Sequence, residues 1–193
     1  MSKKKITWKT FETEHLSIKL PDTFIGGHPT ADRKGLKEEV ESLPEEIRYI
    51  YKNLFSQRNF VFLAADKAFN KDMSSLTCLV VIPEAIPFFQ FNPKIENYIH
   101  IVKKNLGRDF ETVEEDYFEF QGFSGARLLS AQHPRKTRKN PEPDVTRKHL
   151  MHAFKIRRHF WSFDYIADAK VFDTYLPIFD ESLKSLVIKE KAK

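Results

Sequence analysis

Three histidines near one another in the sequence, His149, His152 and His159, are the first candidates for metal ligands. They lie in "HLMHAFKIRRHFWSFDYIAD", where alternating apolar residues predict a hairpin of two long strands that turns near Arg157 and Arg158. Residues three apart on a strand point to opposite faces, so His149 and His152 cannot bind one ion without a bulge. We therefore predict no metal site and no cofactor.

The serine, cysteine and carboxylate residues that could act in covalent or acid–base catalysis stand in sequence contexts that favour a structural role. Ser124 stands in "GFSGA", which lacks one residue of the G-x-S-x-G nucleophile elbow. Cys78 falls inside the apolar run "SLTCLVVIP" and is expected to be a buried thiol. The carboxylates of "ETVEEDYFE" are expected in a charged loop before a strand. Since no Walker A or G-x-G-x-x-G pattern occurs either, we predict a protein that is not an enzyme.

Positive charge is concentrated in one region of the chain. Between His133 and His159 there are nine lysines and arginines and two acids, a net charge of +7, whereas the whole chain carries +5. Within this region, "HPRKTRKNPEPDVTRKH" (133–149) contains three prolines, which favour an extended connector outside the sheet. Concentrated charge of this kind attracts anionic partners.

Several interpretations of the basic region stay open. It can be a solvated connector, a docking surface for an acidic protein, or a nucleic-acid-binding surface that adds aromatic stacking. A pocket for a small ligand between sheet and helices is a further alternative for the chain as a whole. We expect docking to an acidic protein surface, because no nucleic-acid-binding motif accompanies the charge. The residues predicted to bind the partner are Arg135, Lys136, Arg138, Lys139, Arg147, Lys148, Arg157 and Arg158.

The elements that must position these residues follow from periodicity and from turn signals. Strands are predicted at 6–11, 16–20, 60–66 and 75–83, on both sides of Gly122 with a possible bulge near Gly125, and in the hairpin around Arg157. "PDTFIGGHPTADRKG" (21–35) reads as a loop. Helices are predicted over 42–55, over 92–107 with Asn92 as the cap, and in the tail after Asp168, where Pro177 lies inside the apolar pattern.

This order of elements predicts an α+β protein. Consecutive strands with short turns indicate an antiparallel sheet of about six to eight strands, and helices with one apolar face would cover it as an α/β/α sandwich. We expect a single domain over 1–193, since no linker or repeat is visible. The lysines at the N-terminus precede no apolar signal region, and no run is long enough to span a bilayer, so a cytoplasmic location is expected.

Motifs at both ends of the chain and in its middle resemble those of the PsbP-like family. "FETEHLSIKLP" is similar to the family's opening strand pair, which ends at Leu-Pro. "FSGARLLSA" resembles its glycine-containing strand. "RHFWSFDYIADAKVFDTYLPIFDESLKSLVI" resembles its closing pattern of an aromatic strand, a helix with Pro-x-Phe at Pro177 and Phe179, and an ending with Ser185 before aliphatic residues.

The PsbP-like family includes extrinsic accessory proteins of photosystem II, a transport factor that binds the Ran GTPase, and bacterial relatives. The resemblance implies an α/β/α sandwich around an antiparallel sheet and a protein that works by binding rather than by catalysis. The chain departs from the photosynthetic members in its basic 133–149 connector and in showing no thylakoid leader. No ligand residues transfer from the family.

Overall fold

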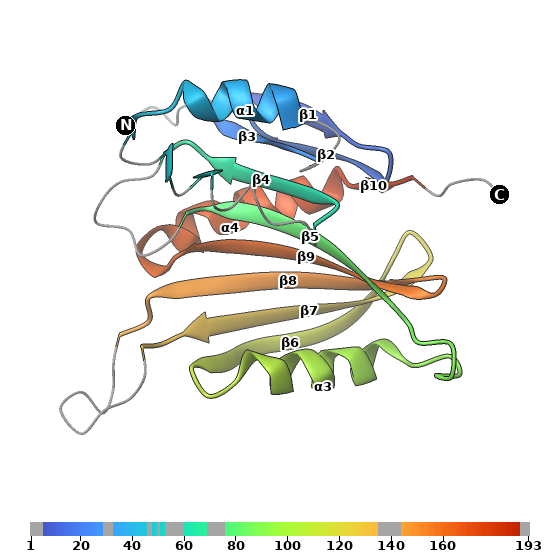
Figure 1. The fold of residues 1–193 in the computed structure, drawn as a ribbon. Coiled ribbons are helices and arrows are strands. Elements are labelled where there is room, and N and C mark those ends of the chain that lie inside the picture. The colour runs from blue at the N-terminus through green and yellow to red at the C-terminus, as the bar shows by residue number, and fades with distance from the viewer. Residues whose placement is uncertain are drawn as a thin grey trace.

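A seven-stranded antiparallel sheet in the order β3-β4-β5-β9-β8-β7-β6 forms the centre of the protein (Figure 1). This is seen in a computed structural model, which describes residues 6–28, 33–45, 48–49, 51–52, 60–68, 76–134 and 144–189. The strands are β3 (Phe24–Gly27), β4 (Phe62–Asp66), β5 (Cys78–Ala85), β6 (Phe110–Phe120), β7 (Phe123–Gln132), β8 (Arg147–Ile156) and β9 (His159–Asp168). The predicted α+β class and the predicted size of the sheet are confirmed.

A second, smaller sheet and three helices complete the described structure. The small sheet has the order β1-β2-β10 and consists of β1 (Trp8–Glu12), β2 (Leu16–Pro21) and β10 (Val187–Ile188). The helices are α1 (Arg33–Glu41), α3 (Ile95–Leu106) and α4 (Ala169–Lys184), and residues 45, 48–49 and 51–52 are also helical. Among the described residues, no helix has the length and apolar character needed to cross a membrane.

The two faces of the large sheet bury different layers. On one face, α4 and the small sheet cover a continuous core that includes Leu16, Phe62, Phe154, Phe163 and Phe179. On the other face there are two separate apolar clusters. One lies under α1 and includes Val40, Leu63 and Val80, and the other lies under α3 and includes Ile99, Met151 and Phe160. Strand alternation produces this division, since neighbouring residues of β4 and β8 enter opposite clusters.

A polar gap separates the two clusters of the second face. Ser162 and Asp164 occupy this face of β9 between Phe160 of one cluster and Ile166 of the other. The Ser162 hydroxyl lies 3.3 Å from a carboxylate oxygen of Asp164. Burial raises the pKa of Asp164 to about 7, and the nearby charge of Glu84 adds to this shift.

The C-terminal helix begins and continues as its sequence indicates. Asp168 caps α4, because its carboxylate accepts a hydrogen bond from the backbone N–H of Lys170 at 2.9 Å. Pro177 lies inside the helix, and Phe172 and Phe179 are buried against the sheet. The predicted hairpin of β8 and β9 also forms, with Ile156 paired with His159 around the turn at Arg157 and Arg158.

Other elements differ from the sequence-based expectations. The segment predicted as a loop (21–35) contains β3 and the first residues of α1. The acidic run predicted as a loop belongs to β6, the edge strand, whose bulge lies between Thr112 and Glu114 rather than near Gly125. Helix α3 begins at Ile95 with Lys94 as its cap, because Asn92 has a positive φ of 47° and stands outside the helix.

Candidate partner-binding surface

Strand β8 separates the predicted partner-binding residues into two groups at opposite ends of the sheet (Figure 1). Arg147 and Lys148 open the strand, whereas Arg157 and Arg158 form the turn after it. Its ten residues at about 3.3 Å each place the two groups about 30 Å apart. The other predicted residues, Arg135, Lys136, Arg138 and Lys139, lie outside the described residues. The described arginines and lysines therefore do not form one surface.

The basic residues at the start of β8 are engaged within the fold. The Arg147 guanidinium donates a hydrogen bond to the side-chain oxygen of Gln132, its cross-strand neighbour on β7. The Lys148 ammonium lies 3.0 Å from a carboxylate oxygen of Asp173 and 5.4 Å from the ring centre of Phe172, both on α4. These contacts connect β8 to β7 and α4, so both side chains have a structural role.

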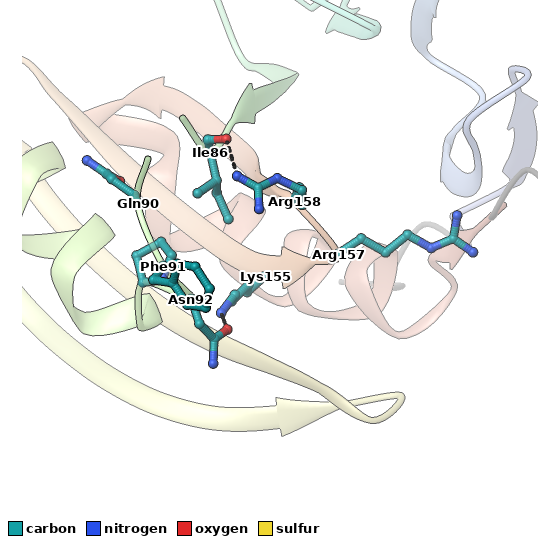
Figure 2. Close-up of a pocket in the computed structure, with 8 residues that line it drawn as sticks. Ile86, Gln90, Phe91, Asn92, Lys155, Arg157 and Arg158 are labelled. Carbon is teal, nitrogen blue, oxygen red and sulfur yellow. Dashed lines mark hydrogen bonds between the residues drawn. The ribbon is translucent and has the colours of Figure 1, made fainter. Parts of the chain in front are cut away.

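At the other end of β8, the arginine turn lies against the segment between β5 and α3 (Figure 2). Arg158 donates hydrogen bonds from Nη2 to the carbonyl oxygens of Pro87 at 3.0 Å and Ile86 at 3.4 Å. Its guanidinium carbon also lies 5.4 Å from the ring centre of Phe88. The Lys155 ammonium donates to the side-chain oxygen of Asn92.

Three phenylalanines of this segment face solvent. Phe88 is 91% exposed, Phe89 is 82% exposed and Phe91 is fully exposed. Scattered exposed apolar residues are normal, but a contiguous group beside charged residues marks an interaction site. We call this group the aromatic–basic surface. It consists of Phe88, Phe89, Phe91, Lys155, Arg157 and Arg158.

The exposed loop is held by a buried residue at its start and a packed helix at its end. Ile86 is buried, and its backbone N–H donates to the carbonyl oxygen of Arg158 at 2.8 Å. After the loop, Tyr98 of α3 stacks on Phe160 of β9 with ring centres 4.5 Å apart. Since both ends are fixed to β9 or its turn, the phenylalanines and arginines keep a defined spacing.

The turn itself has an unfavourable backbone conformation. Arg157, the first residue of a two-residue turn, has a positive φ of 54°. A residue with a side chain is disfavoured in this region, where glycine and asparagine are preferred. Arginine at this position favours a role for its side chain over turn stability. In Figure 2 the Arg157 side chain extends away from the loop.

The smaller of two neighbouring pockets at this surface is below the usual volume of a pocket for a drug-sized ligand. Its volume is about 200 Å³, and its lining includes Ile86, Phe91, Asn92, Lys155 and Arg158. Ligand pockets for drug-sized molecules usually have volumes of about 300–1,000 Å³. An adjoining hollow of about 520 Å³ shares Asn92 and Lys155 and extends along Glu96 and Tyr117. Asn92 therefore lines both pockets.

The residues that the sequence offered for catalysis and metal binding lie apart. Cys78 is buried, and this burial raises the pKa of its thiol to about 12. His149 contacts Phe110 on one face of the sheet, whereas His152 contacts Phe118 and Tyr165 on the other. Burial lowers the pKa of both histidines, to about 4 for His149 and about 3 for His152. The strand alternation therefore separates these two imidazoles as expected.

Sequence reasoning missed the exposed phenylalanines. Their segment, "IPFFQFNP" at 86–93, has apolar residues with neither a strand nor a helix period, and prolines stand near both ends. The prolines keep the segment out of the sheet, so its aromatic side chains have no strand partner to pack on. An aromatic run between two prolines is the signal that would have identified it.

Comparison with solved structures confirms the predicted PsbP-like fold. The structure resembles cyanobacterial PsbP (CyanoP) from Synechocystis sp. PCC 6803, with a TM-score of 0.57 and 13% sequence identity over 96% of this chain and 95% of that chain. It also resembles the Ran-binding protein Mog1p of Saccharomyces cerevisiae, with a TM-score of 0.54 and 9% identity over 95% of this chain and 96% of that chain. No protein-family model matches the chain, and no curated protein matches it.

Proposed function

We propose that this chain is a non-catalytic accessory protein that docks to an acidic protein partner through the aromatic–basic surface. The observation that carries the proposal is the exposure of Phe88, Phe89 and Phe91 in a loop that Arg158 of the β8–β9 turn contacts directly. Aromatic residues and arginine are the types enriched in the centres of protein interfaces. The similarity to the Ran-binding protein Mog1p agrees with a binding role.

The chemistry of the surface defines what the partner must offer. Burial of each exposed phenylalanine is worth about 1.5–3 kcal/mol before the costs of association, so the partner needs apolar recesses. The arginines require carboxylates around those recesses, because unpaired charges are costly to desolvate. An acidic surface with an apolar groove satisfies both requirements.

Charges around the surface favour a protein partner over a nucleic acid. Glu84 stands near the end of β5, paired in register with Phe160, and Glu96 lines the hollow next to Asn92 and Lys155. A nucleic acid strand crossing the phenylalanines would bring its phosphates near these carboxylates. A protein partner can place its own acids on Arg157 and Arg158 alone.

The proposal is tested by site-specific photo-crosslinking in the cells that make the protein. A benzophenone amino acid replaces Phe89 in one variant and Tyr49, an aromatic residue that is 72% exposed outside the surface, in the control. We expect a protein crosslinked only from position 89, which is lost when Arg157→Glu and Arg158→Glu are added. Mass spectrometry of the adduct identifies the partner and its acidic segment.

Other outcomes contradict the proposal. The same adducts from positions 89 and 49, or adducts that survive both charge reversals, would show that this surface does not select a partner. Nucleic acid crosslinked at position 89, with an affinity that falls steeply with salt, would replace the acidic protein by a polynucleotide.

A further inference from the structure

We propose that Glu14, His15 and His28 form a binding site for one divalent transition metal ion, and that Zn²⁺ suits it best. Their ligand atoms all lie within 4.8 Å of one another. In the described part of the chain, this is the one group of three or more histidine, cysteine, aspartate or glutamate side chains that meets this spacing. No residue of this group belongs to the aromatic–basic surface, and the proposal does not depend on the proposed function.

The three residues come from two segments that the fold brings together. Glu14 and His15 lie in the turn between β1 and β2, and His28 follows the last residue of β3. His15 Nε2 is 3.1 Å from a carboxylate oxygen of Glu14, and the rings of His15 and His28 have centres 6.2 Å apart. The sequence shows no metal-binding motif here, because His28 lies 13 positions after His15.

The spacing is close to what an ion needs. Tetrahedral zinc with bonds of about 2.0–2.1 Å sets its ligand atoms about 3.3–3.4 Å apart. The His15–Glu14 pair at 3.1 Å is slightly below this spacing, and the ligand atom of His28, within 4.8 Å of both, needs to move closer to reach it. Two imidazoles and one carboxylate form a ligand set that zinc uses in proteins, with a fourth position left for water. Glu14 is exposed and both histidines are half-buried, so an ion can enter from solvent.

The backbone of the turn that carries two of the ligands is fixed by hydrogen bonds. The Thr13 hydroxyl accepts from the backbone N–H groups of His15 at 3.1 Å and Leu16 at 3.2 Å. The C-terminal segment adds a further bond, since the Lys189 N–H donates to the His15 carbonyl at 2.8 Å. A turn held in this way loses little freedom when a metal binds, and this favours affinity.

A tryptophan next to the site provides a direct measurement. The ring of Trp161 has its centre 6.0 Å from that of His15. The chain has two tryptophans, Trp8 and Trp161, so the Trp8→Phe variant reports on Trp161 alone. In tag-free, chelator-treated Trp8→Phe protein, we expect Cu²⁺ to quench the fluorescence with saturation at one equivalent. Zn²⁺, which does not quench, should compete with Cu²⁺ at the same stoichiometry and should bind in calorimetry.

Variants decide whether these residues bind the ion. Glu14→Gln and His28→Gln should each weaken Zn²⁺ binding at least about tenfold, whereas His100→Gln, at an exposed position on α3, should leave it unchanged. Glu14 is exposed, so its variant keeps the fold intact, and circular dichroism checks His28→Gln. Equal Zn²⁺ affinity in Glu14→Gln, His28→Gln and His100→Gln, or quenching that never saturates, would overturn the site.

Discussion

The guanidinium of Arg158 lies 5.4 Å from the ring centre of Phe88 and donates a hydrogen bond to the carbonyl oxygen of Pro87 at 3.0 Å. One side chain of the β8–β9 turn therefore holds both the backbone and an aromatic ring of the exposed loop. This contact joins the charged and the apolar halves of the aromatic–basic surface. Arg158 therefore positions the exposed loop, in addition to contributing positive charge to the surface.

Removal of the Arg158 side chain should loosen the loop without unfolding the protein. Arg158→Ala loses the bonds to the Ile86 and Pro87 carbonyls, and a hydrogen bond of this kind contributes about 1 kcal/mol. Hydrogen exchange measured by mass spectrometry should become faster in peptides covering 86–92 and stay unchanged in peptides covering β6. Lys184→Ala, at an exposed site on α4, is the matched control. Equal exchange at 86–92 in both variants would contradict the role of Arg158.

Glycine at the first turn position should stabilise the fold while it removes a binding residue. Arg157→Gly relieves the positive φ of 54° and should raise the free energy of unfolding by up to about 1 kcal/mol in urea titrations. Arg157→Ala is the control, because it removes the same side chain but keeps a Cβ at the positive φ. If Arg157→Gly is no more stable than Arg157→Ala, the turn holds no strain.

The polar gap of the second face should make stability depend on pH above pH 4. Burial raises the pKa of Asp164 to about 7, so the folded state binds its proton more tightly than the unfolded state does. The stability from this group is fully present below about pH 4 and is lost as the pH rises to 7. Asp164→Asn should therefore gain stability relative to the native chain at pH 8 and less at pH 4, measured by urea unfolding. An unchanged difference between the two pH values would refute the shift.

A buried histidine should act in the opposite direction. His152 is 3% exposed, and burial lowers its pKa to about 3, with the charge of Arg127 adding to the shift. The unfolded state then binds the proton more tightly, so stability is lost as the pH falls from about 6.5 towards 3. The free energy of unfolding, measured in urea between pH 6.5 and 3, should fall less steeply with pH in His152→Phe than in the native chain. His100→Phe, at an exposed position on α3, should show the native dependence. The same loss of stability at low pH in both variants would exclude His152 as its cause.

Sequence patterns predicted the elements whose signals are local in the sequence. The alternation of β8 and β9 and the Asp168 cap of α4 are local signals, and the structure follows them. The acidic first half of edge strand β6 escaped prediction, because the edge of a sheet tolerates exposed acids on both of its faces. The glycines of β3 read as a loop, yet a Cβ at Gly26 would lie 2.4 Å from the Leu63 carbonyl oxygen, so glycine there permits close strand pairing.

The candidate sites needed the fold itself. Net charge singled out the basic region in the sequence, but a strand of ten residues runs through it and separates its ends. The phenylalanines of 88–91 approach the arginines only through the pairing of β5 with β9. His28 approaches Glu14 and His15 only after β3 joins the large sheet. No spacing along the chain encodes these long-range neighbours.

The affinity of the crosslinked partner for two charge-reversed variants tests the central claim most directly. One variant carries Arg157→Glu and Arg158→Glu, and the other carries glutamate at 135, 136, 138 and 139 in the predicted connector. At 0.15 M salt, where charges are screened beyond about 8 Å, we expect the turn variant to lose at least about thirtyfold in affinity. The connector variant should stay within about threefold of the native chain. A loss confined to the connector variant would contradict the account and assign docking to the connector residues.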